Sequence, residues 1–224
     1  MNYDLLYIVG ILVIPLAAQL WVMANYNKFK KQELAKRISG FEVARKILDE
    51  NGLEKVHIVE IKGTLSDHYD PSRKVLRLST DAFHGETVAA ASIAAHEVGH
   101  AIQDKEGYVW MKIRSLIYPV VRIGTSLSYA VILIGFFTEI LQWFYLGIGL
   151  VGLGLLFQLI TLPVEFDASK RAEKCLKDLK FVSRDEEEGT RKVLGAAALT
   201  YVAGVLTSAM ELVRLVLLFN SRRD

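Results

Sequence analysis

Four long apolar stretches divide the chain, and each has about the length that a helix needs to cross a lipid bilayer. The first, residues 5–24, contains no charged residue. The second and third, residues 115–137 and 140–163, are separated only by Thr138 and Glu139. A link this short predicts an antiparallel helical hairpin that crosses the membrane and returns. We therefore expect three spans here, and we interpret the first as an uncleaved anchor.

The fourth stretch, residues 194–219, is less uniformly apolar because Glu211 and Arg214 interrupt it. Residues three apart lie on one face of a helix, so these two side chains can form an ion pair or extend toward the membrane surface. The stretch is compatible with a fourth span or with an amphipathic helix that lies on the membrane surface. We favour the span.

Positive charge is concentrated in the two polar segments between the apolar stretches. Residues 25–114 hold 15 of the 27 Lys and Arg residues, and residues 164–193 hold 8. Because cytoplasmic loops carry an excess of Lys and Arg, both segments are predicted to lie in the cytoplasm. The hairpin requires the same arrangement, since its two ends must emerge on one side. We expect a multi-pass protein of the cell membrane.

The domain organisation follows from where the apolar pattern starts and stops. We expect an N-terminal transmembrane anchor (1–26), a cytoplasmic segment (27–114), a transmembrane hairpin (115–163), a second cytoplasmic segment (164–193) and a C-terminal transmembrane or interfacial helix (194–224). The two cytoplasmic segments are the places where polar chemistry can occur.

The first polar segment alternates between helical and extended patterns. Apolar residues recur at helical spacing in residues 40–52, and residues 86–104 are rich in alanine, the best helix former. Residues 56–61 and 74–79 have the alternating, β-branched pattern of strands, whereas residues 67–71 have the composition of a turn. This segment is expected to be a small α+β domain.

Composition excludes several classes of protein. A chain with 52% hydrophobic residues is not intrinsically disordered, and the single cysteine, Cys175, cannot form an internal disulfide framework. The formal net charge of +2 gives no indication of nucleic-acid binding, and we expect no nucleic-acid partner. All five histidines lie in residues 25–114, so we look for the chemistry there.

The motif His96-Glu97-Val98-Gly99-His100 stands within the alanine-rich helix. Residues four apart on a helix project from the same face, so both imidazoles can bind one metal ion. Neutral imidazole is a good ligand of Zn²⁺, which makes zinc the expected cofactor. Glu97 lies beside the ion, where its carboxylate can take a proton from zinc-bound water. The spacing predicts His96 and His100 as zinc ligands and Glu97 as the general base.

A catalytic zinc ion needs a third protein ligand and one open position for water. Cys175 stands alone in a basic helical stretch, and we interpret it as structural. His57 lies in a predicted strand, and His68 and His84 lie in turns, where capping or surface roles explain them better than ligation. His68 stays a candidate for contacting the substrate or supporting the ligands.

A carboxylate from a separate element is a better candidate for the third ligand. Glu165 follows the third span directly, where the hairpin returns to the side assigned to the two histidines. The pattern fits a zinc ligand and an interfacial carboxylate at a helix start about equally well. Asp167 is a rival, although two residues away it would point off that helix face.

At these residues the chain resembles the YugP-type family of neutral zinc metallopeptidases of bacteria, which are membrane proteins of the gluzincin kind. The resemblance extends over nearly the whole chain. It rests on the anchor at 5–24, DHYDP at 67–71, AAHEVGHAIQ at 94–103, LPVEFDAS at 162–169 and AAALTYVAG at 196–204. HEVGH is shared by many zinc enzymes, whereas DHYDP and LPVEFDAS in this order are far more specific.

The resemblance implies that His96, His100 and Glu165 are the zinc ligands and that Glu97 is the general base. The arrangement is also similar to the HtpX and CAAX-processing membrane proteases, in which a helical hairpin separates the two histidines from the glutamate ligand. Those proteins usually have an aspartate four residues after the glutamate. Here that position is Ser169, so the group that supports the ligands is absent or replaced.

The expected fold is therefore a mostly α integral membrane protein, with about four transmembrane helices and a small α+β zincin-like cytoplasmic domain. The expected function is hydrolysis of peptide bonds at the cytoplasmic membrane interface, on membrane-protein or peptide substrates. Residues 74–79 are our candidate for the sheet edge that binds substrate in extended form. The alternative is a proteolytically inactive zinc-binding scaffold or adaptor, with membrane-protein partners or a second copy of the chain.

Overall fold

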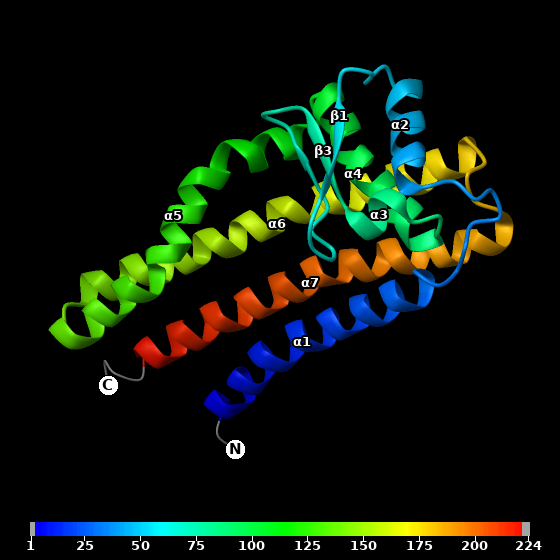
Figure 1. The fold of residues 1–224 in the computed structure, drawn as a ribbon. Coiled ribbons are helices and arrows are strands. Elements are labelled where there is room, and N and C mark those ends of the chain that lie inside the picture. Colours follow the sequence, from blue (N-terminus) through cyan, green and yellow to red (C-terminus); the bar gives the residue numbers. More distant parts are fainter. Residues whose placement is uncertain (1–2, 221–224) are drawn as a thin grey trace. The chain divides into compact units, whose positions relative to one another are not determined.

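The computed structural model describes residues 3–220, and most of them are helical (Figure 1). The elements in chain order are α1 (Tyr3–Phe29), α2 (Gly40–Glu50), β1 (His57–Ile61), β2 (His68–Asp70), β3 (Val75–Ser79), α3 (Thr80–His84), α4 (Val88–Glu106), α5 (Val109–Thr138), α6 (Leu141–Asp178) and α7 (Arg184–Asn220). Four long helices and one small sheet are the main components.

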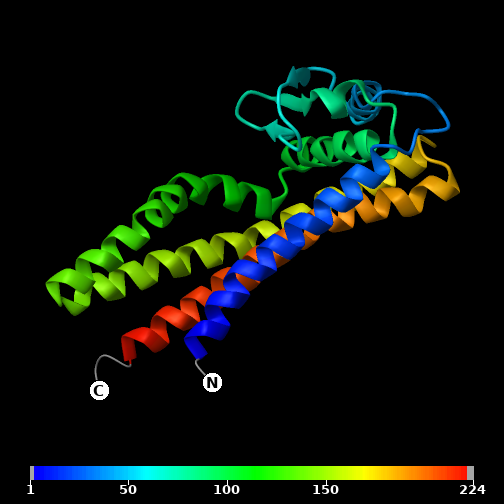
Figure 2. The same ribbon diagram turned by 60° about the horizontal axis from the view of Figure 1, so that its bottom comes forward.

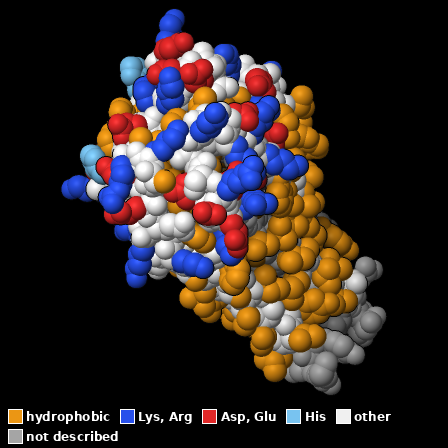
Figure 3. Space-filling view, turned by 90° about the vertical axis from the view of Figure 1, so that its right-hand side faces the viewer, with side chains coloured by type: hydrophobic (Ala, Val, Ile, Leu, Met, Phe, Trp, Pro, Cys, Tyr) orange, Lys and Arg blue, Asp and Glu red, His pale blue; other side chains and the backbone are white. Residues whose placement is uncertain are grey.

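Four helices, α1, α5, α6 and α7, are long and apolar enough to cross a membrane. Their large apolar side chains are widely exposed, as for Leu12 of α1 at 65% and Leu116 of α5 at 78%. Figure 3 shows such side chains gathered over one part of the surface, while charged side chains gather on the other. Exposed apolar surface on this scale marks a membrane-contacting face. The fold is a mostly α membrane protein with a small α+β part, as the sequence predicts.

Two of these helices extend well beyond the predicted spans. The sequence predicts that the third span ends at Pro163, but α6 continues through this proline to Asp178. Helix α7 begins at Arg184, ten residues before the apolar stretch that predicts it. Membrane helices tolerate proline because neighbouring groups satisfy the freed backbone carbonyl. Hydropathy detects only the lipid-facing part of such a helix, so it misses the polar continuation.

The chain forms two compact units. The first contains Lys112–Pro163 with the described residues of Met1–Gln19 and Thr200–Asp224, and the second contains Leu20–Met111 and Val164–Leu199. In the first unit, α5 and the beginning of α6 lie side by side as the predicted hairpin (Figures 1 and 2). A Cβ atom on Gly147 would lie 2.3 Å from the Ile132 side chain. Glycine is therefore needed for this close approach of the two helices.

The second unit contains the sheet, whose strand order is β1-β3-β2. Strand β1 pairs with β3 in parallel, and β2 pairs with β3 antiparallel, with Tyr69 opposite Leu76. The prediction that residues 74–79 form an edge strand is wrong, because β3 has a partner on each side. Strand β2 lies in the stretch that the sequence indicates as a turn, and it is an edge strand instead.

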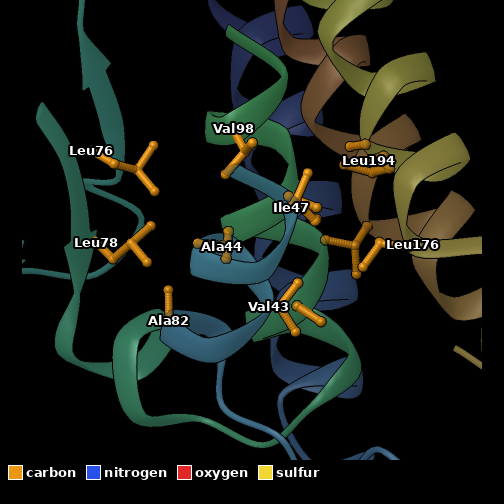
Figure 4. Close-up of a cluster of buried hydrophobic side chains, with 14 of the residues drawn as sticks. Val43, Ala44, Ile47, Leu76, Leu78, Ala82, Val98, Leu176 and Leu194 are labelled. Carbon is orange, nitrogen blue, oxygen red and sulfur yellow. The ribbon is translucent and has the colours of Figure 1, made fainter. Parts of the chain in front are cut away.

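The core of the second unit lies between the sheet and the helices. Leu76 and Leu78 of β3 point toward α2 from one side, and Leu176 and Leu194 lie beyond it on the other (Figure 4). Ile47 of α2 is fully buried between them. Helix α4 runs beneath the sheet in Figure 2. Each of these buried aliphatic side chains contributes roughly 1.5–3 kcal/mol through the removal of its surface from water.

Candidate metal centre

Helix α4 carries the motif with the two histidines, and its ends are well defined. The hydroxyl of Thr87 accepts a hydrogen bond from the Ala90 N–H at the start, and Gly107 ends the helix in the left-handed conformation at φ 67°. Alanine occupies most of the first two turns and has the highest helix propensity. The local sequence thus provides a regular helix on which residues 96 and 100 share a face.

Gly99 lets the last part of α6 approach this helix closely. A Cβ atom at position 99 would lie 2.6 Å from the Ala168 carbonyl oxygen, which is backbone and cannot move aside cheaply. Ala168 is itself fully buried and small. The two helices therefore meet with little side chain between them, and the neighbouring residues of α6 come within reach of the two histidines.

His96, His100 and Glu165 converge on one point. Nε2 of His96 lies 3.3 Å from Oε2 of Glu165, and Nε2 of His100 lies 3.5 Å from the same oxygen. One ligand atom from each residue lies within 4.8 Å of the others. The Glu165 side chain is almost completely buried at 3% exposure. Within residues 3–220, no other group of three or more His, Cys, Asp or Glu side chains could hold a metal ion in this way.

The other ring nitrogen of each histidine has its own partner. Oγ of Ser169 lies 3.2 Å from Nδ1 of His96, and Oε1 of Gln103 lies 3.0 Å from Nδ1 of His100. Each imidazole therefore has its Nε2 directed at the common point. A metal-ligating histidine is ordinarily oriented in this way, by a hydrogen bond at the nitrogen that does not bind the metal.

The donor set fits zinc. Zn²⁺ binds imidazole nitrogen and carboxylate oxygen at about 2.0–2.2 Å, so two tetrahedral ligand atoms are about 3.4 Å apart. The distances of 3.3 and 3.5 Å from Glu165 to the two imidazoles agree with that separation. Three protein ligands also leave one tetrahedral position for water or substrate, which is the pattern of catalytic zinc sites.

Glu97 lies next to His96 and is buried. Its Oε2 accepts a hydrogen bond of 3.0 Å from the Tyr69 N–H of strand β2. Burial raises the pKa of Glu97 to about 7, the nearby His96 opposes this rise, and the negative charges of Glu165 and Asp67 add to it. The hydrogen bond from the sheet edge thus holds this carboxyl group in place.

The other residues considered from the sequence are not members of this group. Nδ1 of His68 contacts the Ser66 carbonyl oxygen, and Nε2 of His84 contacts Glu60. His57 is exposed on β1, and Cys175 lines a separate cleft of about 270 Å³. Oδ2 of Asp167 accepts a hydrogen bond from the amide of Gln103, which itself contacts His100. This rival carboxylate therefore reaches the site only through Gln103.

Sequence reasoning misses three contributors to the site. Gln103 was not considered, because a glutamine three residues after a histidine has no distinctive pattern. From the sequence, Ser169 is distinctive only because it stands where the resemblance to the HtpX and CAAX-processing proteases leads us to expect an aspartate. The backbone N–H of Tyr69 was also missed, since residues 67–71 were interpreted as a turn. No local sequence signal shows which backbone group will face Glu97.

The fold and the site together define a membrane protein whose two histidines and one glutamate are arranged as ligands for zinc. Comparison with known proteins agrees with this class. The chain belongs to the family described as "Putative neutral zinc metallopeptidase", whose model matches residues 4–220. It is 45% identical over 207 residues to the "Putative membrane protease YugP" of Bacillus subtilis (strain 168), covering 92% of each chain. No solved structure matches the chain.

Proposed function

We propose that this protein is a membrane-embedded zinc metalloprotease of the gluzincin type, which hydrolyses peptide bonds. His96, His100 and Glu165 hold the zinc ion, and Glu97 of the His-Glu-x-x-His motif is the general base. The observation that carries this proposal is the convergence of three ligand atoms within 4.8 Å from two separate helices. The membership in a zinc metallopeptidase family supports it independently.

When bound, zinc supplies Lewis-acid chemistry, which polarises a carbonyl oxygen and acidifies water. Glu97 takes the proton from the attacking water and delivers it to the nitrogen of the leaving amine. The Tyr69 N–H keeps the Glu97 carboxylate oriented for both transfers. The buried setting of Glu97 and Glu165 excludes bulk water from the carboxylates.

The edge of β2 is the better candidate for binding an extended substrate. The Tyr69 N–H points away from β3 toward Glu97, so this edge of the strand faces the general base. An extended peptide can add to a sheet edge through main-chain hydrogen bonds, and here it would use main-chain groups other than the Tyr69 N–H, which is bonded to Glu97. A substrate bound there would lie beside Glu97, whereas β3 has no free edge.

The substrates that we propose are membrane proteins or their juxtamembrane segments. The apolar part of α6 ends at Pro163, and Glu165 lies only two residues later. Along the chain, this proposed zinc ligand is therefore close to the membrane interface. The excess of Lys and Arg in residues 25–114 and 164–193 supports a cytoplasmic position for the site and the five-part organisation described above. Partner proteins or a second copy of the chain stay predictions.

The central test is Glu97→Gln in the purified full-length protein. Proteolysis of a model substrate should fall by at least about 100-fold, within the 10²–10⁴-fold contribution typical of a general base. Zinc content should stay near that of the wild type, because Glu97 is not a ligand. His96→Ala should lose both. Undiminished proteolysis in Glu97→Gln would refute the proposal.

The same test separates the enzyme from the alternative scaffold. A scaffold would bind zinc, cleave nothing in vitro, and function in cells equally well with Glu97→Gln. The substrate class is tested with one peptide sequence presented in two forms, anchored in a lipid bilayer and free in solution. We expect faster cleavage of the anchored form, and equal rates would contradict the membrane-substrate proposal.

A further inference from the structure

A chain of hydrogen bonds joins His100 to a carboxylate on another helix. Oε1 of Gln103 lies 3.0 Å from Nδ1 of His100, and Nε2 of Gln103 donates to Oδ2 of Asp167 over 2.8 Å. The same amide nitrogen donates to the Val164 carbonyl oxygen, also over 2.8 Å. One side chain of α4 thus contacts a metal-ligand candidate and two groups of α6.

This network fixes the orientation of the Gln103 amide. Its NH₂ group has two hydrogens, and both have acceptors in Val164 and Asp167. A flipped amide would direct its oxygen at two other oxygens, which is unfavourable in a site where Gln103 is fully buried. The amide oxygen must therefore face His100.

The orientation of the amide in turn fixes the tautomer of His100. An amide oxygen can only accept, so Nδ1 of His100 must carry the hydrogen. The lone pair is then on Nε2, the nitrogen that lies 3.5 Å from Glu165. Neutral imidazole in this tautomer binds a metal ion through Nε2 without first losing a proton.

Asp167 also accepts a hydrogen bond from an arginine of its own helix. The Nε of Arg171 donates to its Oδ2 over 2.5 Å, and the same guanidinium pairs with Glu106 over 2.7 Å. The carboxylate polarises the amide of Gln103, and hydrogen bonds in such a chain strengthen one another. The amide oxygen consequently becomes a better acceptor for the His100 N–H.

We propose that Gln103 is a positioning residue of the metal centre. It transmits the effect of the Asp167 carboxylate to His100 and sets the tautomer and the orientation of the His100 imidazole. This inference rests on the proposed function, because it concerns how tightly the site binds zinc. In many zinc sites a carboxylate accepts directly from the histidine. Here an amide stands between the two groups, and within residues 3–220 the Nδ1 partners of His100 and His96 are the Gln103 amide and the Ser169 hydroxyl.

The experiment measures zinc affinity of the detergent-solubilised full-length protein by competition with a chelating dye. Gln103→Leu should weaken zinc binding 10–100-fold, the usual effect of removing such a supporting partner. Asp167→Ala should weaken it less, by about 3–10-fold, because the amide can still accept from His100. Asp167→Asn should fall between Asp167→Ala and the wild type, because its amide oxygen can accept from Gln103 but carries no charge.

A double variant tests the relay itself. If Asp167 acts on zinc through Gln103, then Gln103→Leu with Asp167→Ala should bind zinc no more weakly than Gln103→Leu alone. Losses that multiply would show that Asp167 acts by another route and would overturn the relay. Absorption spectra of the Co²⁺-substituted protein give a second readout, because the visible bands respond to ligand geometry. They should change in Gln103→Leu.

The matched control is Ser92→Ala, which removes a buried hydroxyl one turn before His96 on the same helix. This hydroxyl bonds only to the Val88 carbonyl among the described residues, so its loss tests general damage to α4. Unchanged zinc affinity in Gln103→Leu, or an equal loss in both variants, would refute the inference. Wild-type protein that binds no zinc would instead refute the proposed function, so the two failures can be distinguished.

Discussion

The hydroxyl of Ser169 lies 3.2 Å from Nδ1 of His96, although 73 residues separate the two in the chain. Ser169 occupies the position, four residues after Glu165, where the resemblance to the HtpX and CAAX-processing proteases leads us to expect an aspartate. The structure therefore places a neutral hydroxyl where a carboxylate would support the histidine. The orientation of His96 is kept, but the supporting charge is not.

Ser169→Ala should weaken zinc binding by about 10-fold, because His96 loses the partner of its Nδ1. Ser169→Asp should bind zinc at least as tightly as the wild type, since an aspartate can accept from the same N–H with a full charge. Both affinities can be measured by competition with a chelator at neutral pH. An alanine variant that binds zinc as tightly as the wild type would show that the hydroxyl contributes nothing.

Gly99→Ala should damage the site more than its small size suggests. The added Cβ would lie 2.6 Å from the Ala168 carbonyl oxygen, so α4 and α6 would have to separate. Such overpacking lowers the free energy of unfolding by about 1–3 kcal/mol. The separation of the two helices would also weaken zinc binding, because the ligands come from both of them. Melting temperature and zinc content measure the two effects.

Gly195→Ala is the control for that substitution, because beyond its chain neighbours and the adjacent backbone of its own helix no described atom lies within 4 Å of the Cβ position there. Alanine favours a helix over glycine by about 1 kcal/mol, so Gly195→Ala should be neutral or stabilising. Equal behaviour of the two variants would mean that close approach at Gly99 is unimportant.

Asp70 should stabilise the sheet in a pH-dependent manner. Hydrogen bonds from the Ser72 hydroxyl and the Arg77 guanidinium hold the pKa of Asp70 below its ordinary value. A lowered pKa in the folded state contributes stability that is present above the unfolded pKa of about 3.9 and is lost as the pH falls through the folded value.

Asp70→Asn should therefore lower the melting temperature at pH 7 by about 2–4 °C, for a loss of about 1 kcal/mol. The difference from the wild type should shrink below about pH 4. Glu50→Gln, which removes an exposed pair with Lys46, is the control and should have little effect. A difference that is the same at pH 7 and pH 3 would contradict the electrostatic explanation.

Glu211 and Arg214 pair on one face of α7, which is one of the two arrangements that their spacing allows, with Arg214 donating over 2.8 and 2.9 Å. The Tyr129 hydroxyl also donates to Glu211. Arg214→Met should destabilise the protein by about 2–3 kcal/mol, because it leaves a buried carboxylate without its counter-charge.

The double variant Glu211→Gln with Arg214→Met should recover most of that loss, since it removes both charges. Thermal unfolding in detergent measures all three proteins. If the double variant is as unstable as Arg214→Met, the loss arises from packing of the arginine side chain.

Much of the fold follows from local pattern. The four apolar stretches and the alanine-rich helix are predicted correctly, because hydropathy and helix propensity act over neighbouring residues. The continuation of α6 has a signal that a span-length window overlooks: Val164, Ala168, Ala172 and Leu176 recur every four residues, and all four are buried. That spacing is typical of one helix face in contact with a core.

Strand β2 could not be predicted in this way, because its pairing depends on distant groups. It has three residues and the composition of a turn, and its position depends on β3 and on the bond from Tyr69 to Glu97. The pairing of His96 with Glu165 is similarly non-local. The hairpin makes it plausible that residue 165 returns to the histidines, but only the assembled helices determine the distance between them.

The close contact at Gly99 has a mechanical consequence. Glu165, Asp167 and Ser169 belong to one rigid helix, while His96, His100 and Gln103 belong to another. A slip of either helix by a single residue is 1.5 Å, which is enough to break hydrogen bonds of about 3 Å. Such a slip would disturb all of these contacts together, so the geometry of the metal centre depends on the register between the two helices.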